Sequence, residues 1–185
     1  MEVVAGGGDR AVVAALSSSS PRRVVVAVDE SEESMHALTW CLSNVVVSAA
    51  AAPPPAVVLV HARSPRPFYY HPVDGGAGYI PTQQVMDTMD QYMASAADTV
   101  VAKAKTICTA LFPNVRVETC VEKGDPRDVI CGAAEKADMV VMGSHGYGFL
   151  QRALLGSVSN HCVHNCKCPV VVVKRPDGGN QRRQT

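Results

Sequence analysis

The sequence is poor in charged and in aromatic side chains. Charged residues make up 18 % of the 185 residues and aromatic residues 5 %. Lysine plus arginine and aspartate plus glutamate number 17 each, so the formal net charge is zero. A protein that binds nucleic acid or an anionic membrane usually carries an excess of positive charge on one face. We therefore expect neither nucleic acid nor membrane as a partner.

Long apolar runs are also missing. A helix that spans a bilayer needs about 20 apolar residues in a row. The longest mostly apolar stretch, Val45 to Ala52, is followed at once by three prolines. The start of the chain carries Glu2 and Asp9, and its apolar stretch Ala11–Leu16 is too short for the pattern of a secretory signal peptide.

The cysteines do not form the pattern of a disulfide framework. There are seven, an odd number, scattered through the predicted helices and strands. This usage is typical of reduced thiols in a cytoplasmic protein. With 47 % hydrophobic residues, the chain is long enough for one domain with a proper core. We expect that domain at residues 22–175, between disordered tails at 1–21 and 176–185.

The chain instead contains an alternation of strand and helix patterns. Runs rich in valine predict five buried strands, at 23–29, 56–62, 115–121, 138–142 and 169–174. Apolar residues at helical spacing predict helices at 31–47, at 82–111, after the cap residue Asp125, and at 157–165. This alternation predicts an α/β fold, an open doubly wound parallel sheet of five strands with helices on both faces. Such sheets bind ligands outside the carboxyl ends of their strands.

A glycine-rich loop follows the fourth predicted strand. Gly143 and Gly146 are followed, after nine residues, by Gly156 and Ser157 at the start of a predicted helix. Glycine suits such a loop because it adopts positive φ and lets the backbone approach a ligand closely. The first N–H groups of the helix would attract an anion such as phosphate. The hydroxyls of Ser157 and Ser159 and the charge of Arg152 would add to this site. In the competing interpretation the loop is purely structural and Ser157 is only a helix cap.

The spacing of these glycines and several other short runs resemble the sequence pattern of a known protein family. The spacing G-x2-G-x9-G-[ST] is similar to that of the ATP-binding universal stress proteins. The resemblance extends over residues 22–175 and includes the VAVD-x-S run at 26–31, Gly124-Asp125-Pro126 and the MGSHG run at 142–146. It implies a plant-like single-domain member with the Rossmann-like fold of the adenine nucleotide alpha hydrolases.

The resemblance also implies a ligand and a set of contacts. The ligand would be ATP or AMP, with Mg²⁺ as a further candidate. The residues expected at the adenosine are Ala27, Val28, Asp29, Ala62, Met142 and Gly143. The residues expected at the phosphates are Gly146, Gly156, Ser157, Val158 and Ser159, together with Arg152 from the charge argument above.

The role of Asp29 has two interpretations. It is either a general base or magnesium ligand, or a carboxylate that caps a helix or bonds the ribose, and we favour the second. The sequence places no second carboxylate near the glycine loop to activate water. We therefore expect nucleotide binding without efficient hydrolysis.

Three functions follow from these observations. The first is a stress-response or signalling module in which bound ATP or AMP controls an unknown protein partner. The second is a slow Mg²⁺-dependent ATPase or phosphotransferase. The third is a structural dimer module without a ligand, which the intact glycine motif argues against. The family often forms dimers through the last strand, and residues 170–173 would otherwise leave an apolar edge unpaired.

Two other segments leave alternatives open. The irregular stretch at 63–81 is either a lid over the adenine or a surface insertion. The cluster of His161, Cys162, His164, Cys166 and Cys168 contains side chains that bind zinc, but it lacks the separated pairs of a zinc finger. We interpret its cysteines as buried structural residues and expect no metal.

Overall fold

The computed structural model describes residues 21–47, 54–63, 82–146 and 155–176. Two of the sequence predictions fall outside these residues in whole or in large part: the charge of Arg152 and the stretch at 63–81, of which only Arg63 is described. The tails, apart from Pro21 and Pro176, lie outside them as well.

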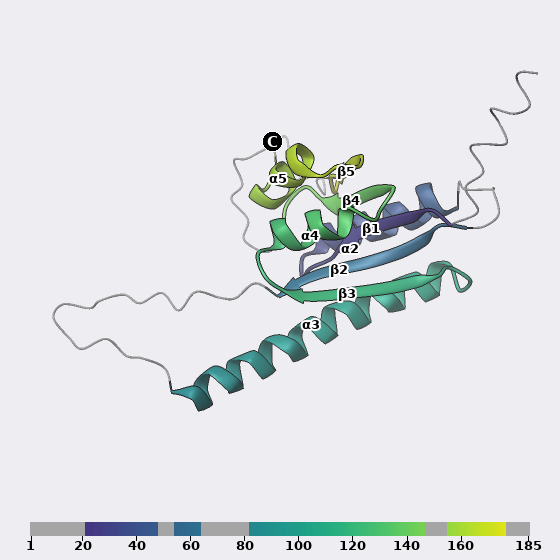
Figure 1. Cartoon of the computed structure of the whole chain (residues 1–185). Helices are drawn as coiled ribbons and strands as arrows, with labels where there is room; N and C mark the ends of the chain where they lie inside the picture. Colours follow the sequence, from purple (N-terminus) through teal and green to yellow (C-terminus); the bar gives the residue numbers. More distant parts are fainter. Residues whose placement is uncertain (1–20, 48–53, 64–81, 147–154, 177–185) are drawn as a thin grey trace, which may run out of the picture.

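Five parallel strands form one sheet in the order β3-β2-β1-β4-β5 (Figure 1). They are β1 (Arg23–Ala27), β2 (Ala56–Arg63), β3 (Val117–Lys123), β4 (Met139–Gly143) and β5 (Val170–Val173). The chain starts in the middle of the sheet, moves to one edge through β2 and β3, and returns to build the other edge. The predicted doubly wound parallel sheet is confirmed.

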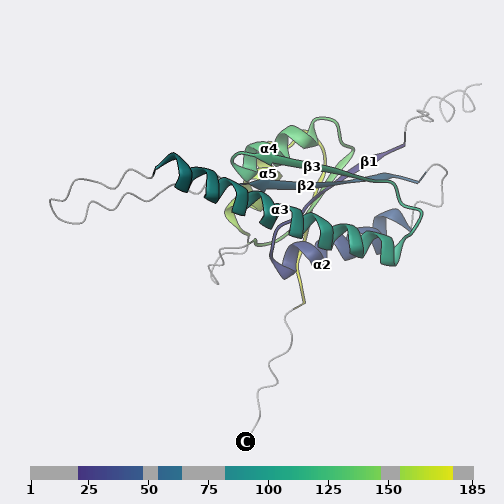
Figure 2. The same ribbon diagram turned by 90° about the horizontal axis from the view of Figure 1, so that it is seen from below.

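Helices cover both faces of this sheet. They are α2 (Glu32–Cys41), which continues as the π-helix η1 (Leu42–Val46), α3 (Gln83–Leu111), α4 (Pro126–Ala134) and α5 (Ser157–Asn165). The view from below shows α2 and α3 together on one face, while α4 and α5 lie behind the sheet (Figure 2). Within the described residues, no helix has the length and apolarity needed to cross a bilayer.

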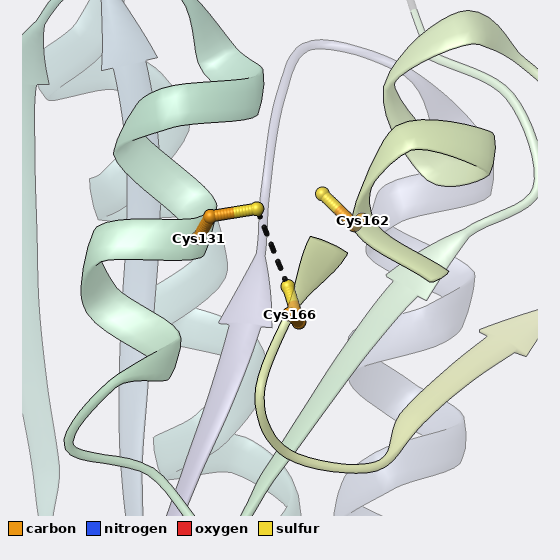
Figure 3. Close-up of side chains that lie close together, drawn as sticks. All are labelled: Cys131, Cys162 and Cys166. Atoms are coloured by element: carbon orange, nitrogen blue, oxygen red, sulfur yellow. Dashed lines mark hydrogen bonds between the residues drawn. The ribbon is translucent and has the colours of Figure 1, made fainter. Parts of the chain in front are cut away.

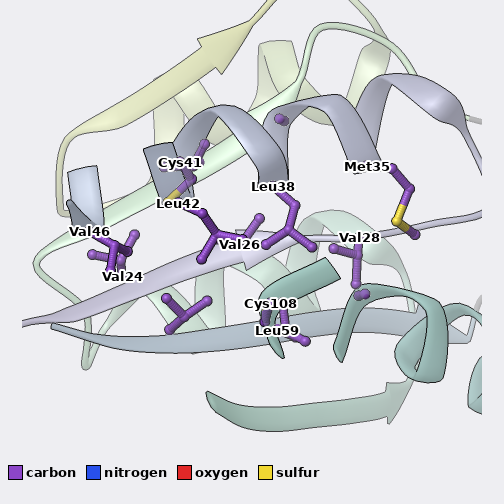
Figure 4. Close-up of a cluster of buried hydrophobic side chains, with 14 of the residues drawn as sticks. Val24, Val26, Val28, Met35, Leu38, Cys41, Leu42, Val46, Leu59 and Cys108 are labelled. Atoms are coloured by element: carbon purple, nitrogen blue, oxygen red, sulfur yellow. The ribbon is translucent and has the colours of Figure 1, made fainter. Parts of the chain in front are cut away.

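The side chains of β1 alternate between two cores. Val24, Val26 and Val28 pack with α2, η1 and α3 on one face (Figure 4). Val25 and Ala27 pack with α4 and α5 on the other. Because both faces are covered, the strand is apolar from Val24 to Ala27, as expected for a central parallel strand.

Buried thiols contribute to the first of these cores. Cys41 and Cys108 are fully buried there (Figure 4). Burial raises the pKa of Cys41 to about 12 and that of Cys108 to about 11, so both thiols stay protonated at neutral pH. All seven cysteines are free in this structure.

Most predicted boundaries differ from the structure by one or two residues, and three of the differences have a visible cause. The first strand ends at Ala27, although the N–H of Val28 still donates to the carbonyl of Val60 at 2.9 Å. The third strand lies two residues later than predicted, because its ladder with β2 continues through the polar residues Glu122 and Lys123. Its backbone pairs regardless of side-chain polarity, whereas the prediction followed the apolar residues. The first helix widens into η1, where the N–H of Val47 bonds the carbonyl of Leu42 at 3.2 Å.

Helix α3 is longer than the sheet it covers. Its 29 residues span about 43 Å at 1.5 Å per residue, while the eight residues of β2 span about 26 Å. Its first turns therefore project beyond the carboxyl edge of the sheet (Figure 1). Only its second half is buried, from Ala97 onward, and Tyr92 in the first half is 70 % exposed. The overhang brings the middle of α3 to the strand ends.

Candidate functional site

A cavity of about 550 Å³ opens at the carboxyl ends of β1, β2 and β4. Its volume lies within the range of about 300–1,000 Å³ that is typical of small-molecule sites. Eleven of the twelve predicted site residues line it, and the twelfth, Arg152, lies outside the described residues. The eleven are Ala27, Val28, Asp29, Ala62, Met142, Gly143, Gly146, Gly156, Ser157, Val158 and Ser159.

One end of the cavity is formed by the start of α5. The N-cap of this helix is Gly156, which makes no side-chain hydrogen bond to the first turn. The other long helices are capped by a side chain: Ser31 accepts from Ser34 in α2, and Asp125 accepts from Arg127 in α4. The first N–H groups of α5 therefore keep their capacity to bind an external acceptor, and their dipole favours an anion.

The carbonyl of Ser144 joins the loop after β4 to α5. It accepts the N–H of Gly156 at 2.8 Å and the hydroxyl of Ser159 at 2.9 Å. The same Ser159 hydroxyl lies 3.0 Å from the carbonyl of Gly156, and Ser144 and Ser159 are both buried. The proton of the Ser159 hydroxyl is thus used inside the protein. What Ser159 can offer a ligand is its backbone N–H, not the hydroxyl donor that we expected.

Each of the three glycines of the motif lies where another part of the chain comes close. A Cβ at Gly156 would lie 3.3 Å from the carbonyl oxygen of Ser144, and one at Gly143 would lie 3.0 Å from the carbonyl carbon of Glu33. A Cβ at Gly146 would lie only 2.5 Å from Oδ2 of Asp29. None of the three has φ in the left-handed region, so the expectation of positive φ is wrong.

Asp29 lies beside this loop and holds the start of α2. Its Oδ1 accepts the N–H of Ser31 at 3.0 Å and also the hydroxyl of the same serine. The hydroxyl oxygen of Ser31 in turn accepts the N–H of Ser34 at 3.2 Å. The helix cap is therefore Ser31, and the interpretation of Asp29 as the cap is wrong. Asp29 orients the cap and brings a carboxylate to the cavity.

The wall at the end of β2 carries two side chains with nitrogen donors. Nδ1 of His61 lies 2.8 Å from the carbonyl oxygen of Val28. Because that oxygen can only accept, Nδ1 carries the proton. Arg63 also lines the cavity, and its buried Nε has no hydrogen-bond partner among the described residues.

A comparison with protein-family models identifies the chain. The model described as the universal stress protein family matches residues 21–174. The chain belongs to the universal stress protein family.

The curated relatives of this universal stress protein include plant and archaeal members. Universal stress protein PHOS34 of Arabidopsis thaliana is 36 % identical over 111 residues, which cover 57 % of this chain and 42 % of the relative. A universal stress protein of Methanocaldococcus jannaschii is 45 % identical over 64 residues, or 34 % of this chain and 38 % of the relative. The chain thus spans about two fifths of the length of these relatives.

Solved structures of the family share the fold. The universal stress protein UspA from Lactobacillus plantarum has a TM-score of 0.65 at 15 % identity, covering 82 % of this chain and 97 % of its own. A family member from Arabidopsis thaliana, solved with AMP bound, has a TM-score of 0.55 at 22 % identity, covering 85 % and 94 %. At such identities the likeness concerns the fold alone.

Sequence reasoning missed several residues of the cavity of this universal stress protein. Glu30 lines it, although we expected no second carboxylate near the glycine loop. His61 could have been found from its place in the Val-His-Ala strand end. The further lining residues that were not predicted are Ser34, Val60, Arg63, Met93, Ala96, Ala97, Pro126, Ile130, His145 and Leu155. Those from α3 share one helical face, but only the overhang of that helix brings them to the strand ends.

The contact between Gly146 and Asp29 can be tested by adding one carbon. We expect Gly146→Ala to lower the free energy of unfolding by about 1 kcal/mol, because the new Cβ must turn the Asp29 carboxylate, whose other oxygen accepts from Ser31. The matched control is Gly132→Ala on α4, where a Cβ meets nothing within 4 Å. An exposed helical glycine replaced by alanine should raise stability by about 0.5–1 kcal/mol. Urea denaturation of both variants is the measurement, and changes of equal sign would contradict the packing argument.

Proposed function

We propose that this cavity binds an adenine nucleotide, ATP or AMP, with its phosphates at the start of α5. The observation that carries the proposal is the first turn of α5, which has no side-chain cap and borders a cavity of nucleotide size. The N–H groups of Ser157, Val158 and Ser159 would donate to phosphate oxygens. The hydroxyl of Ser157 would add a further donor.

The rest of the cavity suits the adenosine part. Its lining near the strand ends is mostly apolar, with Ala27, Val28, Ile130 and Met142. Such walls bury a base, and the backbone at Ala62 offers hydrogen-bonding groups to its edge. Arg63 on the lining of the cavity would add a positive charge that attracts the anionic ligand.

Two solved relatives support the choice of ligand. The Arabidopsis thaliana structure contains AMP, and another universal stress protein was solved in complex with cAMP. The common part of these ligands is adenosine with one phosphate. The chain covers 94 % and 96 % of these two structures, so the likeness in fold extends over nearly the whole of each.

In the cell the bound nucleotide would act as a signal. We expect occupancy of the cavity to alter a surface that an unidentified protein partner recognises in the stress response. Slow Mg²⁺-dependent hydrolysis is the second candidate function, and the observation that favours it is the pair of carboxylates, Asp29 and Glu30, on the lining of the cavity. These two residues would hold the ion beside ATP.

Calorimetric titration with ATP, AMP and adenosine tests the proposal. We expect both nucleotides to bind more tightly than adenosine, because each charged hydrogen bond to phosphate contributes about 1.5–3 kcal/mol, or about 10- to 150-fold in affinity. Gly156→Val should abolish the preference for nucleotides, since its side chain would collide with the Ser144 loop. Ser157→Ala should weaken it by about tenfold. Gly132→Ala should leave it unchanged.

Equal affinity for AMP and adenosine, or full affinity in Gly156→Val, would refute the phosphate site. Release of ADP from ATP in the presence of Mg²⁺, measured over hours, would establish the slow ATPase. A protein that binds none of the three compounds would favour the structural dimer module.

We also propose a homodimer through β5. This strand lies at one edge of the sheet and consists of four valines. The carbonyls of Pro169 and Val173 accept from β4, so by alternation the backbone groups of Val170 and Val172 point away from the sheet. An unpaired apolar edge of this kind is suited to pairing with a second copy.

Removal of one N–H from that edge tests the dimer. We expect the protein to be a dimer at micromolar concentration by size-exclusion chromatography with light scattering. Val172→Pro should make it a monomer, because proline has no N–H to donate. Val172→Ala, which removes a similar side chain but keeps the N–H, should remain a dimer. A monomeric parent protein, or a dimeric proline variant, would contradict the proposal.

A further inference from the structure

Three thiols meet at the far end of α5 from the nucleotide cavity. Cys131 comes from α4, Cys162 from the middle of α5, and Cys166 from the residue that ends α5 (Figure 3). Their three Sγ atoms all lie within 4.8 Å of one another, and those of Cys131 and Cys166 are 3.5 Å apart. Cys162 is fully buried, while the other two are half-buried.

The backbone holds these thiols in place without a disulfide. Cys162 and Cys166 are four residues apart, and the N–H of Cys166 donates to the carbonyl of Cys162 at 2.9 Å. Cys162 belongs to the core that α4 and α5 share with the sheet, and Cys131 and Cys166 pack against it. The positions of the three sulfurs are therefore set by the packing of two helices, so little reorganisation is needed for them to act together.

The spacing of the sulfurs matches that of a three-thiolate metal site. Thiolates bound at about 2.3 Å to one ion in a trigonal or tetrahedral arrangement lie about 4 Å apart. The observed range, from 3.5 Å to at most 4.8 Å, includes that value. Sulfur ligands select soft ions such as Cu(I) and zinc. A disulfide would need only Cys131 and Cys166 and would leave the third thiol without a role.

We propose that Cys131, Cys162 and Cys166 bind one thiophilic d¹⁰ metal ion, Cu(I) or Zn(II), through three thiolates. The ligand set differs from the cluster considered in the sequence, because it includes Cys131 and leaves out Cys168 and both histidines. Nδ1 of His164, for example, lies 2.7 Å from the carbonyl of Asn160 in its own helix, which it can bond. Three sulfurs would complete the coordination of Cu(I), whereas Zn(II) would take a water as its fourth ligand.

The test uses the full chain, reduced and metal-free, under anaerobic conditions. Zn(II) and Cu(I) are titrated separately against a chromophoric chelator for each ion. We expect one ion per chain from at least one of the two titrations. Cys131→Ser and Cys166→Ser should each lower the affinity for that ion by about tenfold or more, since even an outer-shell change costs that much. Cys120→Ser is the matched control, because this half-buried thiol lies on β3 and its Sγ is 3.3 Å from Glu122.

A second measurement distinguishes loss of a metal ligand from misfolding of the variant. The urea midpoint of each variant without metal should stay close to that of the parent protein, and the ion should raise the midpoint of the parent and the control only. Absence of binding by both ions, or equal affinity in Cys131→Ser and the parent, would overturn the site. So would a protein that binds neither ion but forms a disulfide between Cys131 and Cys166 on treatment with oxidised glutathione, as located by mass spectrometry of its peptides. None of these readouts requires a nucleotide.

Discussion

The carbonyl of Ser144 accepts two hydrogen bonds, from the N–H of Gly156 and the hydroxyl of Ser159. Together these bonds fix the start of α5 against the end of β4. They determine where the first N–H groups of α5 lie, and those groups form one end of the cavity. Without these two hydrogen bonds, the glycine loop would still follow β4. It would no longer border the cavity together with the ends of β1 and β2.

The same region explains why glycine occupies three positions of the motif. Each glycine stands where another part of the chain comes close: Gly143 at α2, Gly146 at Asp29, and Gly156 at the Ser144 carbonyl. The glycines of the motif are therefore explained by the packing of the loop against the rest of the chain as much as by the close approach of a ligand to the backbone. A spacing pattern alone cannot separate these two causes, because both require a residue without a Cβ.

Much of the fold could be predicted from the sequence. Valine-rich runs predicted all five strands, because a parallel strand covered on both faces has few polar residues. The strand ends, the glycine motif and the resemblance to the universal stress proteins then indicated which residues line the cavity. The parts that were missed depend on tertiary contacts. Met93 reaches the cavity only because α3 overhangs the sheet, and Cys131 meets Cys166 only because α4 packs on α5. The Ser159 hydroxyl was assigned to a ligand because its acceptor, the Ser144 carbonyl, is 15 residues away.

The central claim is that the first turn of α5 holds a phosphate, and amide chemical shifts in the ¹H–¹⁵N spectrum test it directly. The account predicts that AMP shifts the amide signals of Ser157, Val158 and Ser159 strongly, whereas adenosine leaves them nearly unchanged and affects only the strand ends near Ala62. Hydrogen bonds to a charged acceptor change an amide more than an apolar contact does. Equal shifts of the three amides with adenosine and AMP, or no shift with either, would contradict it.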